Sequence, residues 1–80
     1  LQRALTYAAV HARAAALDAL LSAGAELDGF DQGGTALHWC AWWRKGEGSA
    51  LLLARGANAD VTDPTHGATP AQWAAYRAGG

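Results

Sequence analysis

The sequence predicts an all-α fold in which one helix–turn–helix unit repeats along the chain and stacks into a solenoid. Residues 20–25 (LLSAGA) recur 32 positions later as residues 52–57 (LLARGA). Residues 35–41 (TALHWCA) recur 34 positions later as residues 69–75 (TPAQWAA). Two separate segments that recur at nearly the same offset indicate one structural unit of about 33 residues. Solenoids of such units usually bind other molecules rather than perform chemistry.

The first unit covers approximately residues 1–31 and contains two predicted helices. Leu5, Ala8 and Ala9 share one face of the first helix, because they follow the i, i+3, i+4 spacing of an amphipathic helix. A leucine stripe lines the second helix, and Gly24 stands where a glycine commonly ends a helix. The rest of the unit is rich in glycine and aspartate, which predicts a loop with tight turns.

The second unit covers approximately residues 32–65 and begins with Thr35, a residue type that is favoured as a helix N-cap. Its first helix repeats the apolar face of the first unit. Gly46 and Gly48 then interrupt the helical pattern, and glycine has a low helix propensity. We therefore expect the second helix of this unit to be short or frayed at its start.

The third unit, approximately residues 66–80, is truncated after one predicted helix. Thr69 is its predicted N-cap, and Pro70 takes the first helical position, where a missing N–H group costs nothing. Together the three units predict helices at residues 3–11, 14–23, 36–43, 49–55 and 71–78.

The single domain of residues 1–80 has features of a segment from a longer repeat array. The chain contains no methionine, although a complete translation product normally starts with one. Neither end carries the polar capping repeat that keeps the end of a solenoid soluble. We therefore expect further repeats beyond this segment, or self-association of copies through the uncapped repeat ends.

The repeated segments resemble the ankyrin repeat family, which has a period near 33 residues and a Thr-Pro-Leu-His-x-Ala signature. Residues 35–41 follow this signature with alanine in place of proline and cysteine in place of the first of two alanines. Residues 69–75 keep the Thr-Pro pair but lose the leucine and the histidine, and residues 3–9 (RALTYAA) are a weaker copy. The resemblance covers essentially the whole chain and implies helix–turn–helix repeats joined by hairpin-like loops. It departs at Arg44, where the family typically has a glycine between the two helices.

The function that this resemblance implies is non-catalytic protein–protein interaction, as in a scaffold. Such a module would bind a protein partner through the concave face of its first helices and through its loop tips. The alternative is a regulatory or tethering ankyrin segment of a larger multidomain enzyme, whose catalytic domain would lie outside these residues.

The expected partner-binding residues lie at the ends of the first helices and at the loop tips. Trp42 and Trp43 are adjacent on a helix and point about 100° apart, so at least one of them is expected to be exposed. Tryptophan, tyrosine and arginine dominate many binding interfaces. In the alternative interpretation, both tryptophans cover neighbouring helices. The candidate residues are Trp42, Trp43, Tyr76, Arg77, His11, Gln32 and His66.

Three further aromatic residues, Tyr7, Trp39 and Trp73, occupy the same position in the three successive units. The favoured interpretation is a structural column, in which each ring packs between neighbouring first helices. The alternative is an aromatic row that is exposed on the concave face.

No motif in the sequence points to catalysis, a cofactor or a metal ion. His38 and Cys40 are two positions apart on a helix and point in nearly opposite directions, so they do not form one metal site. The resemblance implies that His38 ties the start of its helix to the neighbouring loop. Cys40 is expected to be a buried, unreactive thiol. Asp31 and Asp63 are expected to organise turns, and the acidic loop residues in general are expected to be solvated.

The composition excludes several classes of partner. A net charge of −1 gives no global attraction for nucleic acid or for an anionic membrane surface. No apolar run reaches the roughly 20 residues that a membrane span needs. The single cysteine cannot form a disulfide within the chain, which fits a reducing compartment and predicts a cytoplasmic protein.

Overall fold

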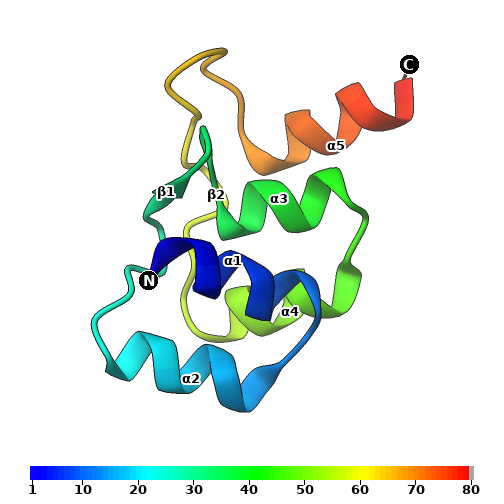
Figure 1. Ribbon diagram of the computed structural model, residues 1–80. Helices are drawn as coiled ribbons and strands as arrows, with labels where there is room; N and C mark the ends of the chain where they lie inside the picture. The colour runs from blue at the N-terminus through cyan, green and yellow to red at the C-terminus, as the bar shows by residue number, and fades with distance from the viewer. Residues whose placement is uncertain (80) are drawn as a thin grey trace.

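The computed structural model describes residues 1–79, which are mostly helical (Figure 1). These residues form, in chain order, α1 (Gln2–Val10), α2 (Ala14–Ser22), β1 (Phe30–Asp31), β2 (Gly34–Thr35), α3 (Ala36–Trp42), α4 (Gly46–Ala54) and α5 (Pro70–Gly79). Each helix lies within a few residues of its predicted position. The helical prediction is therefore confirmed, and the two short strands are an addition to it.

α1, α3 and α5, which are the first helices of the three predicted units, lie side by side and run in the same direction (Figure 1). α3 occupies the middle of this row and contacts both neighbours. α2 and α4 run in the opposite direction and pack against α1 and α3. The loops and strands gather at the N-terminal ends of the row, and the helix–helix turns lie at its C-terminal ends. None of the helices formed by residues 1–79 has the length and apolar character needed to span a membrane.

The core lies between the two layers of helices and combines leucines with small residues. Leu5, Leu17 and Leu52 are fully buried, and burial of one leucine side chain stabilises a fold by roughly 1.5–3 kcal/mol. Ala9 and Cys40 are also fully buried, in α1 and α3. Small side chains at these positions let the helix layers approach closely. The apolar faces predicted from helical spacing are therefore the faces that pack.

Glycines end both second helices as the sequence predicts. Gly24 follows α2 with a φ of +107°, and Gly56 follows α4 with a φ of +93°. The Ala25 amide donates to the Leu20 carbonyl oxygen at 3.0 Å, and the same bond recurs 32 residues later at 3.0 Å. Glycine adopts this left-handed conformation without the steric penalty of a Cβ atom, which ends each helix at a defined residue.

The second helix of the middle unit is neither short nor frayed, so that prediction was wrong. α4 begins at Gly46 and has 9 residues, the same length as α2. Gly48 is buried where an added Cβ atom would lie 2.9 Å from the Cys40 Sγ atom and 2.9 Å from the Ala9 carbonyl carbon. Glycine is therefore needed there for close packing of α4 on α1 and α3, and these contacts outweigh its low helix propensity.

The loop between the first two units contains a tight hairpin. β1 pairs antiparallel with β2, with Asp31 opposite Gly34. Gln32 and Gly33 join the strands with φ values of +53° and +87°, the pattern of a type I′ turn. The hairpin-like loop that the resemblance implies is therefore present at this position, and Gln32 is exposed at its tip.

Candidate functional site

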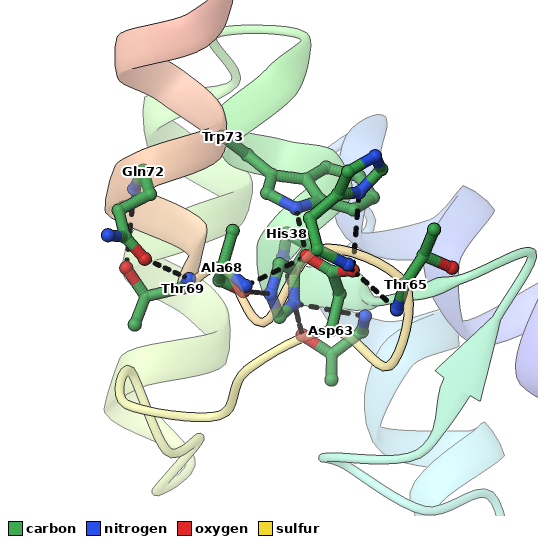
Figure 2. A network of polar contacts seen from close by, with 9 residues as sticks. His38, Asp63, Thr65, Ala68, Thr69, Gln72 and Trp73 are labelled. Atoms are coloured by element: carbon green, nitrogen blue, oxygen red, sulfur yellow. Dashed lines mark hydrogen bonds and ion pairs between the residues drawn. The ribbon is translucent and has the colours of Figure 1, made fainter.

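Buried polar groups tie the start of α3 to the loop before α5 (Figure 2). The Thr35 amide donates to His38 Nδ1 at 3.1 Å, and the His38 amide donates to Thr35 Oγ1 at 3.3 Å. Because Nδ1 accepts a hydrogen bond, Nε2 carries the ring proton and donates to the Ala68 carbonyl oxygen at 2.8 Å. His38 is fully buried. The structural role predicted for this histidine is confirmed.

Gln72 takes the place of the histidine at the start of α5. The Thr69 amide donates to Gln72 Oε1 at 2.8 Å, and the Gln72 amide donates to Thr69 Oγ1 at 3.3 Å (Figure 2). The two helices therefore begin with the same reciprocal cap, as the paired threonines predict. Only His38 has a second ring nitrogen that reaches the next loop.

Asp63 organises the loop between α4 and α5. Its Oδ1 accepts hydrogen bonds from the amides of Thr65 and His66, at 2.9 and 2.6 Å. Its Oδ2 accepts the Ala68 amide at 3.0 Å and the Trp73 indole N–H at 2.9 Å. Burial raises the pKa of this carboxyl, but the four hydrogen bonds outweigh burial and hold the pKa well below its usual range. The turn-organising role is confirmed, whereas the expectation of a solvated carboxylate was wrong.

Trp73 stands at the centre of an aromatic cluster between α3 and α5. Its ring meets Trp39 edge to face, with 5.0 Å between centroids, and meets Trp42 at 6.0 Å. The Trp39 indole N–H donates to the Asp31 carbonyl oxygen at 2.7 Å, just as the Trp73 indole is held by Asp63. Both rings are thereby fixed in orientation. The predicted packing of Trp39 and Trp73 between neighbouring first helices is confirmed.

Tyr7 does not join this column, so the prediction of three equivalent packed rings was wrong there. Its side chain is 58 % exposed. Its ring lies 4.2 Å from the His11 ring, centroid to centroid, one helical turn later on the same helix. The tyrosine therefore packs along α1 instead of contributing a ring to the interface with α3.

A groove of about 550 Å³ opens on the outer side of the aromatic cluster. We call it the aromatic groove. Trp42 is half-buried, whereas Tyr76 is 65 % exposed, so the floor is packed and the rim is open to solvent. The residues that line the aromatic groove are Trp39, Trp42, His66, Trp73 and Tyr76.

Arg77 forms part of the rim of the aromatic groove. Its guanidinium carbon lies 5.4 Å from the Trp42 ring centroid and 5.2 Å from the Trp43 ring centroid. Cation–π contacts at these distances connect the last turn of α5 to the end of α3. Trp43 is 49 % exposed, which confirms that at least one of the two adjacent tryptophans faces solvent.

Residues 32–64 match the family model of the ankyrin repeat. The chain contains an ankyrin repeat. The matched segment includes the hairpin turn, α3 and α4. A search of curated proteins gave no match. Ankyrin repeats are generally non-catalytic modules of protein–protein interaction.

The seven candidate residues fall into two groups around this ankyrin repeat. Trp42, Tyr76 and His66 line the aromatic groove, and Trp43 and Arg77 meet at its rim. The other two candidates lie elsewhere. Gln32 is at the hairpin tip, and His11 borders a separate depression of about 590 Å³ beside the helix–helix turns.

Sequence reasoning did not assign Trp39 and Trp73 to the candidate surface, although both line the aromatic groove. The favoured interpretation was that they pack between helices, with exposure on the concave face as the alternative. The pattern contains a signal that would have placed them there, because Trp39 and Trp42 have i, i+3 spacing, as do Trp73 and Tyr76. Residues with this spacing share one face of a helix.

The ankyrin repeat also contains the single cysteine. Cys40 is fully buried in α3, as predicted, and burial raises the pKa of its thiol to about 11. The thiol is therefore protonated at neutral pH and is a poor nucleophile. Within residues 1–79, histidine, cysteine and acidic side chains form no cluster of three or more that could hold a metal ion.

Proposed function

We propose that this chain is a non-catalytic, ankyrin-type solenoid segment that recognises a protein partner, working in a reducing compartment such as the cytoplasm. Within the parallel row of α1, α3 and α5, the surface formed by α3 and α5 provides its binding face. The observation that carries the proposal is the aromatic groove between α3 and α5, which leaves large aromatic side chains accessible beside a packed aromatic floor.

The physical basis of recognition is a surface that is already formed before a partner arrives. The indole N–H groups of Trp39 and Trp73 are engaged by internal acceptors, and Trp42 packs edge-on against Trp73. These rings are therefore already ordered in the folded chain, so binding of a partner costs little side-chain conformational entropy. Tyrosine and tryptophan at such positions give large contact area with few rotatable bonds, which is why they dominate binding interfaces.

The proposal is tested by selecting peptides from a random display library with the wild-type chain. We expect the selected peptides to lose about tenfold or more in affinity with Tyr76→Ala and with Trp42→Ala, since truncation of a hot-spot residue costs about 2 kcal/mol. Affinity is measured by titration calorimetry, and helicity is checked by circular dichroism.

Tyr7→Ala is the matched control, because Tyr7 has a similar exposed fraction but lies on α1 away from the groove. This variant should bind the selected peptides as the wild type does. Selected peptides that bind the folded Tyr76→Ala and Trp42→Ala variants with wild-type affinity would overturn the assignment of the groove.

A further inference from the structure

The charge distribution along the first helices points to a partner of one chemical kind. We propose that the aromatic groove takes an apolar anchor side chain from a peptide segment whose next residues are carboxylates, and that these carboxylates meet Arg77. This inference rests on the proposed function, because it names the class of partner for the same groove.

Four cations lie in the last turns of the first helices or shortly after them, and one of these cations, Arg77, lies over the Trp42 ring of the aromatic groove. We call this set of cations the basic edge. This basic edge is exposed, and its side chains form no ion pair with any group in residues 1–79. Glu47, in the first turn of α4, is the acidic residue beside it. The basic edge consists of Arg13, Arg44, Lys45 and Arg77.

The opposite edge of the molecule has the reverse charge. Most of the acidic residues follow α2 or α4 in the loops at the N-terminal ends of the first helices: Glu26, Asp28, Asp31, Asp60 and Asp63. The two cations outside the basic edge are paired, Arg3 with Asp31 at 3.7 Å and Arg55 with Asp18. A net charge of −1 therefore conceals a separation of charge along the axes of α1, α3 and α5.

Arg77 links the basic edge to the aromatic groove. Its guanidinium lies against the faces of Trp42 and Trp43 and makes no side-chain hydrogen bond within residues 1–79. Cation–π contacts do not use the N–H groups as hydrogen-bond donors to an acceptor oxygen, and these groups fit a carboxylate in two parallel hydrogen bonds. An anchor side chain in the groove would therefore place the following carboxylates beside a positioned donor.

The repeat itself strengthens the positive field at this edge. Arg13 and Lys45 are the N-cap residues of α2 and α4. The N-terminal end of a helix carries partial positive charge, so a cation there is electrostatically unfavourable for the isolated fold. A carboxylate of a partner would interact favourably with both the side chains and the helix ends.

A cationic anchor fits the aromatic groove less well, although aromatic rings attract cations. It would meet the charge of Arg77 at the rim. Asp63, which accepts the Trp73 indole N–H, is buried, and its two oxygens already accept four hydrogen bonds, so a cationic anchor in the groove would not contact them directly. Charge complementarity therefore favours an acidic partner segment.

The test uses three synthetic peptides that share a Leu-Phe anchor followed by two glutamates, two serines or two lysines. In fluorescence polarisation at low salt, the glutamate peptide should bind wild type about tenfold more tightly than the lysine peptide, with the serine peptide between them. High salt should reduce this difference, because screening weakens the interaction of exposed charges. Arg77→Glu should reverse the order.

Arg3→Glu is the matched control, since it makes the same change in charge on an exposed side chain of α1 and should keep the wild-type order. Equal binding of the three peptides, or tightest binding of the lysine peptide, would overturn the acidic preference while leaving the groove as a binding site. The acidic preference is also wrong if none of the three designed peptides binds, while peptides that lack carboxylates are selected from the library and lose affinity with Tyr76→Ala. If the designed peptides do not bind and the library yields no binding peptide, both proposals are wrong.

Discussion

His38 performs two structural tasks with one side chain, and Gln72 performs only the first of them. Both residues close a reciprocal cap with the threonine three positions earlier. His38 also donates from Nε2 to the Ala68 carbonyl oxygen, which connects the start of α3 to the loop of the next unit. The histidine therefore contributes to the stability of one helix and to the stacking of two units.

Because Gln72 closes the same cap without a ring nitrogen that reaches the next loop, the substitution His38→Gln tests what that second bond contributes. His38→Gln should keep the cap and lose the bond to the Ala68 carbonyl oxygen. The free energy of unfolding should fall by only about 1 kcal/mol, because that oxygen still accepts the Asp63 amide at 2.8 Å and is not left without a partner. His38→Ala should cost more, since the cap is lost as well. Urea unfolding measures both variants. Equal stability of His38→Gln and wild type would show that the link to the next unit contributes nothing.

Because of Asp63, the free energy of unfolding of the chain should fall at acidic pH. Its pKa in the folded chain lies below the ordinary aspartate value of about 3.9, so its stabilising contribution is complete above that pH. The contribution is lost as the pH falls below about 4 towards the lowered pKa. In urea unfolding, wild type should exceed Asp63→Asn most at neutral pH, and this difference should shrink below about pH 4.

Asp60→Asn provides the control, because Asp60 is exposed and its carboxylate accepts no hydrogen bond within residues 1–79. That variant should follow the wild-type curve. A difference between wild type and Asp63→Asn that stays constant from neutral to acidic pH would contradict the role assigned to the buried carboxylate.

At the level of elements, α4 shows how packing can override helix propensity. Gly46 and Gly48 are both unfavourable for a helix, and from the sequence alone they predict a broken start. The structure distinguishes them, because a Cβ atom at Gly46 would meet open space, whereas one at Gly48 would collide with α1 and α3. The glycine that weakens the isolated helix is the one that allows it to dock.

Two alanine substitutions in α4 separate these effects. Gly48→Ala should destabilise the chain by about 1–3 kcal/mol through overpacking, despite its higher helix propensity. Gly46→Ala should be neutral or stabilising by a fraction of a kcal/mol. Thermal unfolding compares the two variants. A Gly48→Ala variant as stable as Gly46→Ala would mean that α4 is not held as closely as described.

The helices and their ends could be predicted from the sequence because the signals are local. Thr35 and Thr69 mark helix starts, and Gly24 marks a helix end, through contacts with residues a few positions away. Gly48 and Asp63 could not be interpreted in this way, because their roles depend on groups brought close by folding. The candidate site was predicted in part, since helix-end residues were identified, whereas packing was the favoured interpretation for the groove floor and exposure was its alternative.

At the level of the whole molecule, the row of first helices presents different surroundings at its two sides. Ala9 of α1 is fully buried beneath α4, whereas the matching Ala75 of α5 is exposed. Within residues 1–79, no second helix covers α5. The two sides of the row therefore differ in how much of the first helix is covered by residues 1–79.

All four tryptophans of the chain lie in the floor or rim of one groove, three in its lining and Trp43 against Arg77. The indole emission of the molecule therefore originates from this one surface. A bound partner would change the polarity around these rings, so the intrinsic tryptophan fluorescence of the unlabelled protein would report binding.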